Sequence, residues 1–114
     1  MTDDRGIILH VSGSEEAQLH AGITSARNVR AQLPDIVMEI VVQGPAVAFL
    51  RADSELRDEL ATLGDGVIVV LACGNSLRSI GIEPDGLLRG VTVVPAAVVH
   101  LAMRQLEGWA YIRV

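Results

Sequence analysis

The sequence contains no lysine, and all 9 of its basic residues are arginine. Without a lysine the chain cannot form a Schiff base with pyridoxal phosphate or a carbonyl substrate, and it cannot supply the lysine of a P-loop. Aromatic residues are equally scarce, with 1 Trp, 1 Tyr and 1 Phe. So few rings give little for nucleic-acid bases or a flavin to stack on. The formal net charge of -5 also argues against nucleic acid, because phosphate binding requires clustered positive charge.

Cysteine occurs once, as Cys73, so no internal disulfide forms and the fold does not depend on an oxidising compartment. The three histidines, His10, His20 and His100, lack metal-ligand spacing, and we expect neither a metal nor another cofactor. No apolar run reaches the length of a membrane span, and the polar, acidic start of the chain is unlike a signal peptide. We therefore expect a soluble, cytoplasmic protein that does not bind membranes.

What the sequence does contain is an apolar core and regular patterning. Half of the 114 residues are hydrophobic, and the mean hydropathy is +0.41. A chain of this length buries a core without disulfides or metals, so residues 1–114 are interpreted as one domain. Five apolar runs predict strands, at 6–11, 36–42, 66–72, 91–94 and 109–114.

Helical spacing separates these runs. The apolar residues from Leu19 to Leu33 recur at spacings of four and three, which predicts a helix that Pro34 ends. Ser12 with Glu15 suggests a capping box for this helix, with Ser14 as a competing cap. The other predicted helical segments are a turn opened by Pro45, a helix capped by Asp53 or Ser54 and stopped by Gly64, a short helix from Cys73 to Ile80, and a helix from Pro95 to Glu107. Strands that alternate with helices predict an α/β fold, a three-layer α/β/α sandwich with a mostly parallel five-stranded sheet.

Ligands of open parallel sheets gather beyond the carboxyl ends of the strands, where the strand order reverses. If the order is flavodoxin-like, the first and third strands are neighbours, and the residues that end them face one crevice. The candidate site residues are then Ser12, Gly13, Cys73, Gly74 and Asn75, with Gln43 at the next strand end.

Cys73 is the most informative of these candidates because it ends a strand and begins a helix. Only a thiolate is a nucleophile, and the positive end of a helix dipole stabilises a thiolate. A lone cysteine at such a position is also often a small, inert core residue. Gly74 would let a ligand approach the backbone, and Asn75 could instead cap the helix. Arg78 would attract an anionic sulfur species or simply lie in solvent.

Two histidines and the side chains of the last strand are also considered for a functional role. His10 is interpreted as a hydrogen-bonded core histidine, and His100 as a surface or interface residue. In the last strand, Trp109, Tyr111 and Arg113 point to one face. These large aromatics face either another subunit or the last helix.

Three segments form a more specific pattern: Ala72-Cys73-Gly74-Asn75-Ser76-Leu77, Val42-Gln43-Gly44-Pro45-Ala46-Val47 and the closing Glu107-Gly108-Trp109-Ala110-Tyr111-Ile112. In these segments, and over nearly its whole length, the chain resembles the DsrE/DsrF-like family. The resemblance implies a YchN-like fold and assembly as a homotrimer or homohexamer. It departs from the family at Ala96-Ala97, which replaces the Ser-Gly often found after the proline.

The resemblance also implies a function. Characterised members relay sulfur as a cysteine persulfide, received from a donor protein and passed to an acceptor protein. Cys73 matches the sulfur-carrying cysteine, and Gln43, Gly74 and Asn75 match motif positions without an assigned role. The expectation is therefore a sulfur carrier with sulfurtransferase-like activity, whether or not it is an enzyme in its own right. The alternatives are a non-catalytic module that binds a small ligand or a protein in the same crevice, and a redox sensor that forms an intersubunit disulfide.

Overall fold

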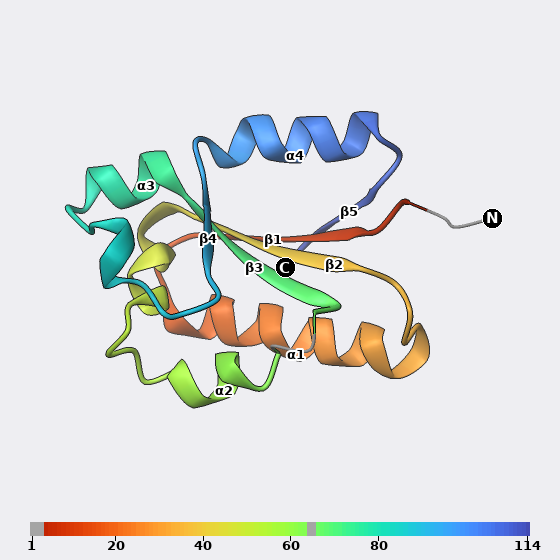
Figure 1. Cartoon of the computed structure of the whole chain (residues 1–114), viewed down its shortest axis with the longest axis horizontal. Helices are drawn as coiled ribbons and strands as arrows, with labels where there is room; N and C mark the ends of the chain where they lie inside the picture. Colours follow the sequence, from red (N-terminus) through yellow and green to blue (C-terminus); the bar gives the residue numbers. More distant parts are fainter. Residues whose placement is uncertain (1–3, 64–65) are drawn as a thin grey trace.

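A computed structural model describes residues 4–63 and 66–114 and shows a five-stranded, all-parallel sheet (Figure 1). The strand order is β4-β3-β2-β1-β5. The strands are β1 (Ile7–Ser12), β2 (Met38–Gln43), β3 (Ile68–Cys73), β4 (Thr92–Val94) and β5 (Ala110–Arg113). Each lies within or one residue beyond a predicted apolar run, because β-branched residues favour a pleated, buried strand.

The helices lie on both faces of this sheet. Helix α1 (Glu16–Gln32) and the short α2 (Arg57–Ala61) cover one face, and α4 (Ala97–Leu106) covers the other (Figure 1). The 3-10 helix η1 (Gly44–Leu50) follows β2, and helix α3 (Gly74–Ser79) follows β3, so both lie at the carboxyl-terminal edge of the sheet. A second 3-10 helix, η2 (Pro84–Gly86), precedes β4. The predicted three-layer α/β/α sandwich is confirmed.

The predicted neighbourhood of the first and third strands is wrong. β2 lies between them and pairs with both, at Val42↔Ala72 on one side and Ser12↔Gln43 on the other. β2 takes the middle of the sheet because it is buried on both faces, with Ile40, Val41 and Val42 all fully buried. The order therefore runs outward from β1 to β4, and the chain returns across the sheet to β5.

The predicted caps of the first two helices are also wrong. Glu15, not Ser12 or Ser14, is the N-cap of α1, and it forms a capping box with Gln18. Ser12 cannot cap this helix because it is still paired in β1. Helix α2 begins later than expected, with Leu56 as N-cap, whose N–H the Ser54 hydroxyl accepts at 3.1 Å. The predicted stop at Gly64 lies outside the described residues.

The core has two layers, one on each side of the sheet. The larger layer packs β1, β2 and β3 against α1, η1 and α2. The smaller layer lies under α4 and consists of Ile8, Val41, Leu71, Cys73, Ala97, Leu101 and Trp109. Because β4 and β5 are opposite edges, α4 must cross the sheet between them and so covers the site residues described below. In the described part of the chain, no helix is long and apolar enough to cross a membrane.

Candidate functional site around Cys73

Three of the predicted site residues lie in one row across the ends of β1, β2 and β3. Ser12 pairs with Gln43 in the β1–β2 register, and Val42 pairs with Ala72, so Cys73 is the neighbour of Gln43 in the next strand. Adjacent strands lie about 4.8 Å apart. Gln43, which was predicted at the strand end next to the crevice, is thus the middle residue of this row, because β2 lies between β1 and β3.

Cys73 is both the last residue of β3 and the N-cap of α3. Its residue exposure is only 2%, and it packs in the apolar layer under α4. The sulfur nevertheless has polar contacts, because the Ala97 N–H at the start of α4 donates to Sγ at 3.4 Å. The thiol therefore lies where the N-terminal ends of two helices meet.

These contacts decide the acidity of the thiol. Burial is the largest influence and raises the pKa of Cys73. Hydrogen bonds from the Ser76 hydroxyl, the Ala97 N–H and the N–H groups of Ser76 and Asn75 lower it, and together they outweigh burial. The net effect lowers the pKa of Cys73, so the structure stabilises the thiolate in a site that is almost closed to solvent.

Ser76 is a contributor that the sequence analysis missed. Its Oγ accepts the N–H of Gly44 at 2.8 Å, at the first residue after β2. With that lone pair occupied, the hydroxyl proton is available to Cys73. The sequence did contain a signal for Ser76. It is the third residue after Cys73, the N-cap of α3, and residues three apart in a helix lie on the same face.

Gly74 lets another segment of the protein approach its backbone closely, whereas the sequence led us to expect a ligand there. A Cβ at this position would lie 2.9 Å from the Val94 carbonyl oxygen and 3.1 Å from that of Pro95. The segment that approaches Gly74 is thus the connection from β4 to α4, which carries the Ala97 N–H to Cys73. Helix α4 begins at Ala97 with Ala96 as N-cap, two residues later than the predicted start at Pro95.

The backbones of Gly13 and Gly44 lie against each other just after the ends of β1 and β2. The Gly13 carbonyl accepts the N–H of Ala46 at 2.8 Å, and a Cβ on Gly44, whose φ is +78°, would lie 3.2 Å from that carbonyl oxygen. Both strand ends are therefore held by backbone contacts rather than open to a ligand at this point.

Asn75 and Arg78 lie on the exposed surface of α3. Both side chains are exposed, and the Arg78 guanidinium donates to the Asn75 side-chain oxygen. The expectation that Asn75 caps α3 is wrong, since Cys73 holds that position and Asn75 contributes its backbone N–H instead. Arg78 is thus paired on the helix surface and does not contact the sulfur.

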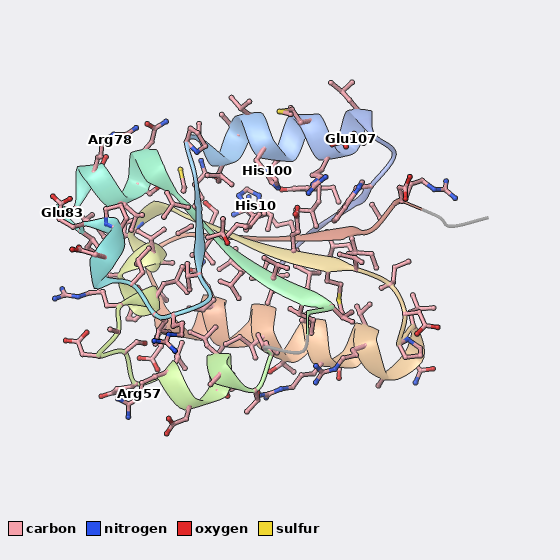
Figure 2. All side chains as sticks on the ribbon, viewed as in Figure 1. His10, Arg57, Arg78, Glu83, His100 and Glu107 are labelled. Carbon is pink, nitrogen blue, oxygen red and sulfur yellow. The ribbon has the colours of Figure 1, made fainter. Side chains whose placement is uncertain are left out.

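His10 is confirmed as a buried, hydrogen-bonded histidine, and its partners are informative. It is 8% exposed and lies between α4 and the sheet (Figure 2). Its Nδ1 is 2.6 Å from the Tyr111 hydroxyl, and its Nε2 is 2.8 Å from the Gln43 side-chain oxygen. His10 therefore connects the edge strand β5 to the residue beside Cys73.

A second polar cluster fastens α4 to the sheet. Glu39, on β2, is 6% exposed and accepts from Arg104 at 3.0 and 2.8 Å and from His100 at 2.7 Å. Burial raises the pKa of Glu39, but the hydrogen bonds and charges of Arg104 and His100 outweigh it and lower the pKa. Glu39 was not predicted from the sequence, although a carboxylate inside an apolar run was a signal for it. His100, predicted to be a surface or interface residue, is half-buried and pairs with Glu39.

Trp109 belongs to the protein's own core. It is 9% exposed, and the Arg104 guanidinium lies 4.3 Å from the centre of its ring. Packing under the last helix, rather than contact with another subunit, accounts for this side chain. Within residues 4–63 and 66–114, no group of three or more His, Cys, Asp or Glu side chains could hold a metal ion.

The chain is similar to known proteins in both sequence and structure. The sequence model of the DsrE/DsrF-like family matches residues 7–114. The chain belongs to the DsrE/DsrF-like family. The family is associated with sulfur relay in general, and its match includes every residue of the site described above.

Two solved structures share the fold of this chain. A protein of unknown function, MTH1491 from Methanobacterium thermoautotrophicum, is 37% identical, with a TM-score of 0.90 over 97% of this chain and 100% of that one. The ychN protein from E. coli is 18% identical, with a TM-score of 0.83 over 96% of this chain and 99% of that one. The second likeness confirms the expected YchN-like fold. No curated protein matches the chain.

Proposed function

We propose that the protein is a sulfur carrier that holds sulfane sulfur as a persulfide on Cys73 and passes it to a partner thiol. The observation that carries this proposal is the placement of Sγ at the N-terminal ends of α3 and α4, with the Ala97 N–H at 3.4 Å. Family membership supports it in general terms.

The chemistry needs no external oxidant or reductant. The Cys73 thiolate attacks the outer sulfur of a donor persulfide, a sulfur–sulfur bond forms at Sγ, and the donor leaves as a thiolate. An acceptor thiolate then attacks the same outer sulfur, and Cys73 leaves as a thiolate. Each step exchanges one sulfur–sulfur bond for another, so the relay is redox-neutral.

The lowered pKa of Cys73 suits both steps. It increases the fraction of thiolate available for attack, and it makes Cys73 a better leaving group when the sulfur is passed on. Its burial requires that the start of α4 shift to admit a donor, because Ala97 is the residue that contacts the sulfur from that side.

Intact-mass spectrometry of the reduced protein tests the proposal directly. The folded protein is exposed to a low-molecular-weight persulfide and then to a thiol acceptor, with unfolded protein and Cys73→Ser alongside. We expect a gain of one sulfur atom only in the folded wild type, followed by its loss to the acceptor. If the folded protein gains no more sulfur than the unfolded chain, Cys73 is not activated and the proposal fails.

The second candidate is a non-catalytic binding or assembly module, which two observations favour. Cys73 is nearly inaccessible at 2% exposure, and α4 presents an exposed apolar face. This reading predicts that Cys73→Ser preserves every property of the protein. The redox-sensor alternative gains no support from this geometry, because an intersubunit disulfide needs two Sγ atoms in contact and Cys73 is buried.

We also propose that the protein is a homotrimer or homohexamer assembled through α4. The four apolar side chains on the outer face of this helix are 55% to 87% exposed, which is costly for a monomer in water. They are Val98, Val99, Met103 and Leu106.

A further inference from the structure

The side-chain oxygen of Gln43 faces the ring of His10. Nε2 of His10 faces the side-chain oxygen of Gln43 at 2.8 Å, so Nε2 carries the proton and donates. In the neutral ring Nδ1 is then an acceptor, and the Tyr111 hydroxyl at 2.6 Å donates to it. The chain of donors therefore runs from Tyr111 through His10 to the oxygen of Gln43.

This arrangement leaves the amide nitrogen of Gln43 with two unused protons. Its oxygen is occupied by His10, and among the described residues none accepts from its nitrogen. With its oxygen turned to His10, Gln43 presents its N–H groups on the side away from that ring. Tyr111 contacts the other ring nitrogen of His10 and so helps to hold the ring in this position.

Gln43 and Cys73 share one face of the sheet at adjacent positions. Side chains alternate along a strand, so Gln43 points to the same side as Val41, which packs with Cys73 under α4. The β2–β3 register places the two residues directly across from each other. The nearest unused donors to Cys73 on the neighbouring strand are therefore those of Gln43.

The thiolate itself does not need these donors. Sγ already receives hydrogen bonds from Ser76, Ala97 and Asn75, and Gln43 is not among the groups that shift its pKa. A persulfide carries a second sulfur about 2.05 Å beyond Sγ. That outer sulfur holds the negative charge and requires a hydrogen-bond donor of its own.

We propose that Tyr111 and His10 are positioning residues that hold the Gln43 amide so that its N–H groups bind the outer sulfur of the Cys73 persulfide. This inference rests on the sulfur-carrier function proposed above. It assigns the Tyr111 hydroxyl, on the edge strand β5, a role in a site whose nucleophile lies on β3, beyond β1 and β2 in the sheet.

The equilibrium constant for loading sulfur onto Cys73 measures how much Gln43 and Tyr111 stabilise the persulfide. The protein is equilibrated with a fixed ratio of a low-molecular-weight persulfide and its thiol, and intact mass gives the fraction that carries one extra sulfur. Gln43→Leu, Tyr111→Phe and the double variant are compared with the wild type, and Gln32→Leu, an exposed position at the end of α1, is the matched control. Alkylation of the unloaded thiol across pH is measured in parallel.

We expect Gln43→Leu to lower the loading equilibrium constant about tenfold, the effect of losing one hydrogen bond to a charged group. Tyr111→Phe should lower it several-fold in the wild type and have no effect in the Gln43→Leu background, because Tyr111 acts through Gln43. The alkylation profile of Cys73 should stay the same in all variants.

Three results would overturn the inference, and they distinguish it from the carrier function. If the wild type loads but Gln43→Leu loads equally well, or if the two substitutions have additive effects, the positioning role is wrong and the carrier function stands. If the folded wild type itself gains no sulfur, both fail together.

Discussion

Ser76 is the residue whose hydroxyl connects the end of β2 to the thiol. It accepts the Gly44 N–H at 2.8 Å and donates to Cys73, so its substitution has two separable consequences. Ser76→Ala should raise the pKa of Cys73, because one of the groups that stabilise the thiolate is lost. It also leaves the Gly44 N–H without its acceptor, at a cost of about 1 kcal/mol of stability.

The pH dependence of Cys73 alkylation measures the first consequence. We expect the profile of Ser76→Ala to move to higher pH and the rate at neutral pH to fall several-fold. Ser79→Ala, at the exposed last position of α3, is the matched control and should behave as the wild type. An unchanged profile for Ser76→Ala would mean that the hydroxyl does not act on the sulfur.

Glu39 is the residue whose charge holds α4 on the sheet, and its folded pKa is lowered by Arg104 and His100 against the effect of burial. A carboxylate with a lowered pKa contributes stability above its unfolded pKa, near 4.5, and loses that stability as the pH falls through the folded pKa. The wild type should therefore be less stable in acid, and Glu39→Gln should lack this part of the pH dependence.

Glu39→Gln should also be less stable at neutral pH by about 1–3 kcal/mol, because the partly exposed Arg104 loses its buried carboxylate partner. Chemical denaturation at several pH values checks both statements. The control is Glu107→Gln, since Glu107 is half exposed and pairs with the same arginine at 3.5 Å. That solvent-screened pair should matter little, and equal losses in the two variants would contradict the assigned role of Glu39.

At the scale of elements, Gly74 sets how closely the start of α4 approaches α3. A Cβ would lie 2.9 Å from the Val94 carbonyl oxygen, so Gly74→Ala must push the β4–α4 connection away. We expect a loss of about 1–3 kcal/mol in stability and a raised pKa of Cys73, because the Ala97 N–H moves with that connection. Thermal unfolding and alkylation profiles measure the two effects.

The control for this substitution is Gly86→Ala. A Cβ on Gly86 meets no atom within 4 Å, so this variant should match the wild type in both measurements. If Gly74→Ala is as stable as Gly86→Ala and alkylates at the same pH, the approach of the two segments is looser than the structure indicates.

The elements were predictable from sequence because each strand is a local apolar run and α1 carries a clear helical period. What the sequence did not provide was the order of the strands. Flavodoxin-like pairing and the observed pairing place the same apolar runs in a buried sheet, and periodicity does not distinguish them. Cys73, Gln43 and Ser12 were found by their positions at strand ends, which hold in either order.

Ser76, Glu39 and Tyr111 were harder to assign because their roles come from contacts between distant segments. Glu39 pairs with a residue 65 positions later, and His10 with one 101 positions later. The alternation of side chains along a strand predicted the face of Tyr111, but no local pattern could name its partner.

At the scale of the whole molecule, the proposed assembly through α4 leads to a test of the oligomeric state. Met103 is 55% exposed at the centre of the outer apolar face. If α4 is the interface, Met103→Glu places a charge in each contact between subunits, and burial of a charge without a partner is strongly unfavourable. We expect the wild type to sediment as a trimer or hexamer and Met103→Glu to sediment as a monomer with unchanged circular dichroism. Leu33→Glu, at an apolar position that is 52% exposed beside α1, should keep the assembly of the wild type. A monomeric wild type, or a Met103→Glu variant that assembles normally, would show that α4 is not the interface.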